Sequence, residues 1–112
     1  MRYTPLTSLA QLDAIDSASR SGAVIIFKHS TRCMISRAAW SRLETKWTSA
    51  DDGTRTVYHL DLLAHRDVSD AIEQRYGITH ASPQLLVIRD GECVYDASHF
   101  SISYQDTIER TR

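Results

Sequence analysis

One unbroken apolar run, Ala23–Phe27, limits the possible folds of this chain more than any other feature. Such a run, rich in β-branched residues, is typical of a strand covered on both faces, because a strand with one face in water alternates apolar and polar residues. It is far shorter than the roughly 20 residues of a membrane-spanning helix. We therefore expect a central strand over 23–28, in a sheet with helices on both sides.

Helical and strand patterns alternate along the rest of the chain. Apolar residues recur at helical spacing in the segments that we interpret as helices: 9–22, 34–48, 67–77 and 104–108. Alternating or β-branched patterns indicate further strands: 56–61, 84–89 and 92–96. The last two strands flank Asp90-Gly91, a common hairpin turn, which predicts that they are antiparallel.

Local signals predict the helix starts and one buried face. The candidate caps precede the first, second and last helices: Thr7 or Ser8, Ser30 or Thr31, and Ser101 or Ser103. The buried face of the second helix is expected to hold Ile35, Ala39, Leu43 and Trp47, with Trp40 on its flank. The segment Asp51-Asp52-Gly53 is interpreted as a turn.

The order of these elements predicts an α/β fold. Strands that alternate with helices imply a right-handed parallel crossover, and a terminal hairpin adds antiparallel strands to the same sheet. This is the thioredoxin-like arrangement, with a central mixed sheet of two parallel strands plus a C-terminal antiparallel hairpin, flanked by helices. The 112 residues, of which 42% are hydrophobic, predict a single domain over 1–112.

Charge and targeting patterns exclude several function classes. The 13 Lys and Arg residues and 14 Asp and Glu residues give a formal net charge of -1 and are scattered, so we expect no nucleic-acid partner. No segment has the layout of a secretory signal or a membrane span, which predicts a cytoplasmic protein that does not bind a membrane. The five histidines do not have the spacing of a metal site, so we expect no metal.

Cys33 lies where the central strand leads into the second helix. Its sulfur would face the unpaired N–H groups and partial positive charge of the helix N-terminus, which favour a thiolate. Lys28, His29 and Arg32 would add positive charge if their side chains reach it. The interpretation is a nucleophilic or redox-active thiol, and the alternative is a cysteine packed under the helix.

Ser82-Pro83 precedes the strand 84–89 and, in a thioredoxin-like sheet, faces the catalytic cysteine. A cis peptide bond there would aim a backbone N–H and C=O at a bound thiol or disulfide. His99 follows the final strand and returns to the same end, either beside the thiol or on the open surface. Cys93 should lie on the order of 10–15 Å from that end, which is too far for a disulfide with Cys33. We expect Cys93 to be a partly buried strand residue.

Residues Phe27–Ser36 resemble the F-K-H-S-T-x-C-P-I-S motif of the YtxJ-like monothiol bacilliredoxin family, which belongs to the thioredoxin-like superfamily. Further segments agree with the family in order and spacing: Leu60–Ser69, His80–Gln84 and Ala97–Phe100. The resemblance implies a thioredoxin-like fold and a thiol–disulfide oxidoreductase. It also implies that bacillithiol, a low-molecular-weight thiol, is the co-substrate and that no cofactor is tightly bound.

By this resemblance, Cys33 attacks the mixed disulfide between bacillithiol and a client protein and takes the bacillithiol onto itself. The expected partners are therefore S-bacillithiolated client proteins and bacillithiol. The same likeness provides the candidates for holding the ligand: Lys28, Thr31 and the Ser82-Pro83 loop, with Pro83 cis.

The chain departs from the motif at Met34, where the family usually has Pro, and at Arg32, whose positive charge would favour a thiolate or an anionic ligand. Ser36, the third residue after Cys33, is not a cysteine, which disfavours a dithiol reductase of the thioredoxin type. Two alternatives stay open. One is a non-catalytic thioredoxin-like binding or redox-sensing stress module, and the other is a glutaredoxin-like reductase that uses another low-molecular-weight thiol.

Overall fold

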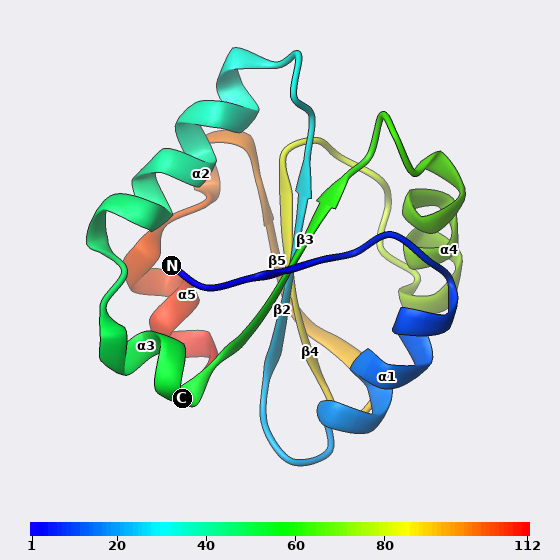
Figure 1. Cartoon of the computed structure of the whole chain (residues 1–112), viewed down its shortest axis with the longest axis horizontal. Coiled ribbons are helices and arrows are strands. Elements are labelled where there is room, and N and C mark those ends of the chain that lie inside the picture. Colours follow the sequence, from blue (N-terminus) through cyan, green and yellow to red (C-terminus); the bar gives the residue numbers. More distant parts are fainter.

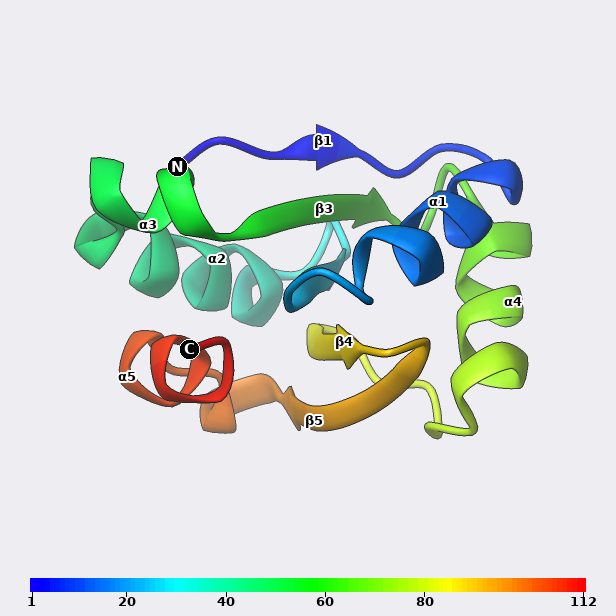
Figure 2. The same ribbon diagram turned by 90° about the horizontal axis from the view of Figure 1, so that it is seen from below.

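The computed structural model describes all 112 residues and contains a five-stranded mixed sheet between two layers of helices (Figures 1 and 2). The strands are β1 Thr4–Pro5, β2 Val24–His29, β3 Thr56–Asp61, β4 Gln84–Arg89 and β5 Glu92–Ser98. Their spatial order is β1-β3-β2-β4-β5. β1 and β2 each pair with β3 in parallel, whereas β4 is antiparallel to both β2 and β5. The predicted mixed sheet is confirmed.

The helices divide between the two faces of this sheet. They are α1 Ala10–Ala18, α2 Met34–Lys46, α3 Ser49–Thr54, α4 Arg66–Tyr76, α5 Tyr104–Arg110 and the short 3₁₀ helix η1 His99–Ser101. Figures 1 and 2 show α2, α3 and α5 on one face and α1 and α4 on the other. None of the helices is long and apolar enough to cross a bilayer.

The central strand β2 is buried over its whole length, as its apolar run predicts. Val24 and Ile26 belong to the apolar cluster on the side of α1 and α4, whereas Ile25 and Phe27 belong to the cluster on the side of α2. Because strand side chains alternate between faces, the next residue along, Lys28, points toward α4. The side chains of the last residues of β2 therefore lie on two different faces of the sheet.

The edge strand β1 has no counterpart among the predicted strands. Thr4 pairs with Tyr58 and Pro5 with His59, and the N–H of Leu6 donates to the His59 carbonyl at 2.8 Å. The sheet thus has three parallel strands instead of the two predicted. Two exposed residues carry no alternating pattern, and proline is tolerated there because β1 lies at an edge.

The predicted cap of α2 is wrong. Neither Ser30 nor Thr31 caps this helix, because its N-cap residue is Cys33 and no side chain accepts a first-turn N–H. Ser30 instead donates its own backbone N–H to the Ser36 hydroxyl at 3.0 Å. The N–H groups of the first turn are therefore left free of side-chain partners next to the thiol.

The other two predicted caps have different outcomes. At α1 neither Thr7 nor Ser8 is the cap, because the N-cap residue is Leu9 and no side chain caps the helix. The backbone N–H groups of Thr7 and Ser8 donate instead to the Gln11 side chain, at 2.7 and 3.1 Å. At α5 the prediction is confirmed for Ser103, whose hydroxyl accepts the N–H of Asp106 at 3.2 Å.

The segment interpreted as a turn, Asp51-Asp52-Gly53, lies inside helix α3. Thr48 and Asp51 cap this helix reciprocally, since each side chain accepts the other residue's N–H, at 3.2 and 3.0 Å. Such a box usually pairs Ser or Thr with Glu or Gln, so an aspartate in that place hid the signal. Asp51 also accepts the hydroxyl of Tyr104 at 2.6 Å, which ties α3 to α5.

The buried face of α2 agrees with the prediction except at its start. Ala39 and Leu43 are fully buried, and the partly buried Trp40 and Trp47 pack against the same cluster. Ile35 is 38% exposed, however, and the residue that enters the interior in the first turn is Ser36.

Candidate functional site

The connections after β2 and β3 and the connection before β4 meet at one edge of the sheet, at the top of Figure 1. Lys28 near the end of β2 pairs with Gln84 at the start of β4. The N–H of Leu62, just after β3, donates to the His29 carbonyl at 3.0 Å. We name this edge, formed by residues 30–33, 62–65 and 79–83, the thiol edge.

Cys33 is the N-cap residue of α2 and is half-buried, with a free thiol. Its N–H donates to the Ser30 carbonyl at 3.1 Å, and its carbonyl accepts the N–H of Arg37 at 3.1 Å. No acidic residue lies in the first turn of α2. The sulfur therefore stands at the positive end of a helix dipole with no carboxylate from that turn to oppose it. The predicted place of Cys33 is confirmed.

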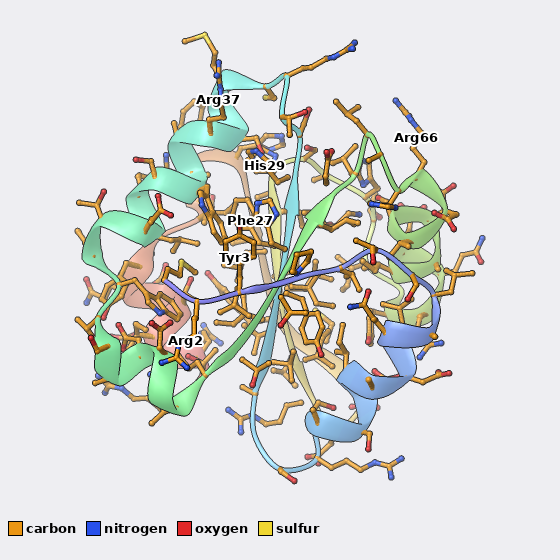
Figure 3. The ribbon with its side chains drawn as sticks, viewed as in Figure 1. Arg2, Tyr3, Phe27, His29, Arg37 and Arg66 are labelled. Carbon is orange, nitrogen blue, oxygen red and sulfur yellow. The ribbon has the colours of Figure 1, made fainter.

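Arginines flank this thiol without carboxylate partners. The ion pairs of the structure involve only Arg55 and Arg75, so Arg32 and Arg37 have no acidic side chain within 4.0 Å. Figure 3 shows Arg37 at the start of α2 and Arg66 at the start of α4, on either side of the thiol edge. Thr31 and Arg32 are exposed in the loop that leads into α2.

The Ser82-Pro83 loop lies at the thiol edge, and its peptide bond is cis. Pro83 is buried, and its carbonyl accepts the N–H of His99 at 3.1 Å. His99 is exposed and has a φ of 53°, the left-handed region that few non-glycine residues adopt. The chain thus brings His99 back to the proline loop, at the end where the sequence places it.

Lys28, the remaining candidate for holding the ligand, lies elsewhere. Its side chain is fully buried on the α4 face of β2, and Nζ lies 2.6 Å from Nδ1 of His80. Burial lowers the pKa of this ammonium to about 8, although Glu73 and Asp70 oppose the shift. The expectation that Lys28 adds charge beside the thiol is therefore corrected, because Cys33 begins a helix on the other face of the sheet.

The buried His29 and the half-buried His59 form a pair under α2 that spacing along the sequence does not reveal. Their rings lie 5.0 Å apart, and His59 also meets the rings of Trp40 at 4.5 Å and Tyr3 at 5.0 Å. Figure 3 shows Tyr3, Phe27 and His29 on the α2 side of the sheet. Parallel pairing of Phe27 with His59 creates this cluster, and no motif signals it.

Burial makes both imidazoles harder to protonate. It lowers the pKa of His59 to about 4, and the neighbouring His29 adds to the effect. It also lowers the pKa of His29, and Arg37 acts in the same direction, while Asp61 opposes it. Both rings are therefore neutral at pH 7, and Nδ1 of His29 lies 2.7 Å from the buried Ser36 hydroxyl.

Cys93 occupies the opposite end of the sheet. It pairs with Ile88, which in turn pairs with Val24 at the start of β2, whereas Cys33 follows the end of that strand. Its half-buried thiol donates to the Tyr95 carbonyl at 3.3 Å, and burial raises the pKa of the thiol. The predicted partly buried strand residue is confirmed.

Comparisons with known proteins agree with this geometry. The family model of the monothiol bacilliredoxin BrxC matches residues 4–107. A solved protein with a thioredoxin fold is similar, with a TM-score of 0.81 and 25% identity over 96% of this chain and 91% of that chain. Thioredoxin from Fasciola hepatica has a TM-score of 0.73 and 15% identity over 97% and 99% of the two chains. Reduced thioredoxin pre-protein from Schistosoma mansoni has a TM-score of 0.69 and 18% identity over the whole of both chains.

The two thioredoxins show the fold alone, and with it the predicted thioredoxin-like architecture is confirmed. The family match covers the sheet, the thiol edge and the cis-proline loop together. With its free thiol at the start of α2, the chain belongs to the monothiol bacilliredoxin family and has a role in thiol redox chemistry.

Proposed function

We propose that this protein removes bacillithiol from S-bacillithiolated client proteins through a mixed disulfide on Cys33. The observation that carries the proposal is a single accessible thiol at the N-terminus of α2 with no second thiol beside it. Ser36 fills the position of a resolving cysteine, and Cys93 lies at the far end of the sheet. A lone thiol cannot form an internal disulfide, so the adduct must be resolved by a second molecule.

The reaction has two exchange steps. The Cys33 thiolate attacks the bacillithiol sulfur of the client mixed disulfide, which forms the Cys33–bacillithiol disulfide and releases the client cysteine as a thiolate. A second bacillithiol thiolate then attacks the bacillithiol sulfur of that adduct. This step forms bacillithiol disulfide and regenerates the Cys33 thiolate, so bacillithiol is a co-substrate and no bound cofactor takes part.

Groups at the thiol edge supply the remaining contacts. Thr31 and Arg32 precede the sulfur, and the positive charge of Arg32 suits an anionic thiol. The Ser82-Pro83 loop offers backbone groups to the disulfide, and His99 borders it through the Pro83 carbonyl.

Two large exposed apolar side chains suit contact with a client protein. Met34 next to the thiol is 76% exposed, and Phe100 next to His99 is 78% exposed. Isolated exposed apolar residues are common, but Met34 begins α2 directly after the thiol, and Phe100 follows the residue that bonds the Pro83 carbonyl. A client protein that docks at Cys33 would meet Met34 first, because this side chain follows the thiol directly.

The test compares one client peptide that carries bacillithiol, glutathione or cysteine on its thiol. Release of the peptide with transfer of the bacillithiol mass to Cys33 is the expected result, and Cys33→Ser should abolish both. Preferential reaction with the glutathione form would assign the protein to glutaredoxin-like reductases. No adduct with any of the three peptides would leave a binding or redox-sensing module.

A further inference from the structure

Lys28 and His80 form a pair that the exchange steps do not use. Lys28 is 0% exposed, and its ammonium lies 2.6 Å from Nδ1 of His80. No carboxylate lies within 4.0 Å of this ammonium, since the ion pairs of the structure belong to Arg55 and Arg75. A buried ammonium without a carboxylate is costly unless a strong hydrogen bond offsets its desolvation. The imidazole of His80 is that partner.

His80 links the central strand to the segment that carries the cis proline. It lies in the connection between α4 and β4, in the residues that lead to Ser82-Pro83. Its backbone N–H donates to the Glu73 carboxylate, and its Nδ1 lies 3.5 Å from the Ser69 hydroxyl. Glu73 and Ser69 both belong to α4. One residue of the loop is therefore held by β2 through its ring and by α4 through its backbone.

Other contacts hold the two ends of the same loop. Gln84, the cross-strand partner of Lys28, donates its Nε2 to the Thr79 carbonyl at 3.0 Å. At the other end, the N–H of His99 donates to the Pro83 carbonyl. Between them, the contact of Lys28 with His80 connects the middle of the loop to the strand that leads to Cys33.

We propose that Lys28 and His80 are positioning residues that hold the Ser82-Pro83 loop at the thiol edge, and that neither contacts the bound thiol. This inference rests on the proposed function. It gives Lys28 a role different from the ligand contact that the family resemblance implies. A displaced loop would weaken docking of the mixed disulfide at Cys33 without changing the reactivity of the sulfur itself.

The charges around the pair set its protonation. Burial lowers the pKa of Lys28 to about 8, while Glu73 and Asp70 on α4 raise it. Burial and then the Lys28 charge lower the pKa of His80, Arg66 adds to this effect, and the same two carboxylates oppose it. With Lys28 charged and His80 neutral, Nδ1 accepts and the ring proton sits on Nε2. Protonation of His80 would place two cations 2.6 Å apart and break the contact.

The first test uses the only two lysines of the chain. Lys28→Met removes the donor, and the matched control Lys46→Met changes an exposed lysine of α2. We expect kcat/KM for an S-bacillithiolated peptide to fall by about 10- to 100-fold in Lys28→Met, the scale of a misplaced reaction partner. Alkylation of Cys33 by iodoacetamide, which needs no docking loop, should keep its rate, and the control should change neither value.

Unchanged peptide exchange in a folded Lys28→Met protein would overturn the inference. So would a changed rate of alkylation, because Lys28 would then act on the sulfur. If the variant does not fold, His80→Asn and His80→Leu decide instead. Asn retains an acceptor near the place of Nδ1, so the His80→Asn variant should exchange the peptide faster than the His80→Leu variant. Equal rates in the two variants would refute the positioning role of the contact between Lys28 and His80.

A readout independent of activity is the ¹⁵N NMR spectrum of His80. We expect an Nε2–H tautomer in the wild type and an upward shift of the His80 pKa in Lys28→Met, because the neighbouring cation is gone. A protonated Nδ1 in the wild type at pH 7 would exclude the contact. If the wild type fails to release bacillithiol, the proposed function fails, and the pair is then tested by this spectrum and by exchange with the glutathionylated peptide.

Discussion

The hydroxyl of Ser36 lies 2.7 Å from Nδ1 of His29, inside the molecule directly behind the thiol loop. The same oxygen accepts the N–H of Ser30 at 3.0 Å, and Nδ1 is the only acceptor that its hydrogen contacts. The hydroxyl therefore donates to His29, whose own proton must sit on Nε2. Ser36 is thus a fully buried link between β2, the thiol loop and α2, at the position where a dithiol enzyme would carry its second sulfur.

Ser36→Ala should destabilise the fold by about 1–3 kcal/mol, because it leaves the Ser30 N–H and the His29 ring nitrogen buried without partners. Urea unfolding measures the effect. Ser41→Ala, at an exposed position of the same helix, is the matched control and should change the unfolding free energy by less than about 0.5 kcal/mol. Equal effects of the two substitutions would show that the buried link contributes nothing to stability.

The His29 and His59 pair should make the protein sensitive to mild acid. The pKa of His59 falls from its ordinary value of 6.5 to about 4 in the fold, so between these pH values the unfolded chain binds more protons than the folded one. The stability from this group is complete above pH 6.5 and is lost as the pH falls toward 4. Urea midpoints measured across this window should decrease steadily with falling pH.

Two variants identify the source of that slope. His59→Gln removes the titrating group and should reduce the slope of stability against pH, leaving the parts that His29 and His80 carry, because the pKa values of both are also lowered in the fold. His65→Gln, which changes a histidine outside the cluster, should keep the full slope. The buried Asp51 is not a competing cause, because burial raises its pKa but hydrogen bonds from Tyr104 and Thr48 bring it below its ordinary 3.8. A full slope in His59→Gln would contradict the prediction.

Cys93→Ser should leave bacillithiol transfer unchanged, because the thiol of Cys93 is half-buried at the far end of the sheet and burial raises its pKa. The substitution should lower the unfolding free energy by about 1 kcal/mol, the usual scale for a change at a partly buried position. Transfer rates and urea unfolding of the same preparation test both statements. Loss of transfer in a folded Cys93→Ser protein would mean that the second cysteine resolves the adduct.

The order of most helices and strands along the chain and the place of Cys33 could be predicted because they depend on local patterns. The apolar run of β2 fixes a strand with two covered faces, and Asp90-Gly91 adopts the positive φ angles, 54° and 75°, that its hairpin turn requires. The stop of α4 at Gly77, with a φ of 68°, is local in the same sense. Such signals act within a few residues, so they can be interpreted without knowledge of the rest of the fold.

The parts of the site that could not be predicted depend on which strands become neighbours. His29 and His59 meet because β2 and β3 pair in parallel with Phe27 opposite His59, a register that no short motif encodes. The family likeness placed Lys28 near the ligand, but one position along β2 reverses the face on which a side chain lies. Lys28 therefore meets His80, far along the sequence, and the thiol helix lies on the other face.

Met34→Pro, which restores the family's usual residue after the cysteine, should stabilise this protein. Met34 is the first residue of α2, its side chain is 76% exposed, and its N–H donates to no backbone or side-chain acceptor, so proline removes no hydrogen bond. A residue before proline must be extended, and Cys33 already has φ -106° and ψ 119°. Because the native backbone fits, the smaller entropy of the unfolded chain should raise the unfolding free energy by about 0.4–1 kcal/mol.

Ile35→Pro, one position further into the helix, tests whether the gain depends on this match, since proline there would force Met34 out of its helical conformation and should destabilise the protein. A loss of stability in Met34→Pro under urea would mean that the backbone around Cys33 does not rest in the conformation described.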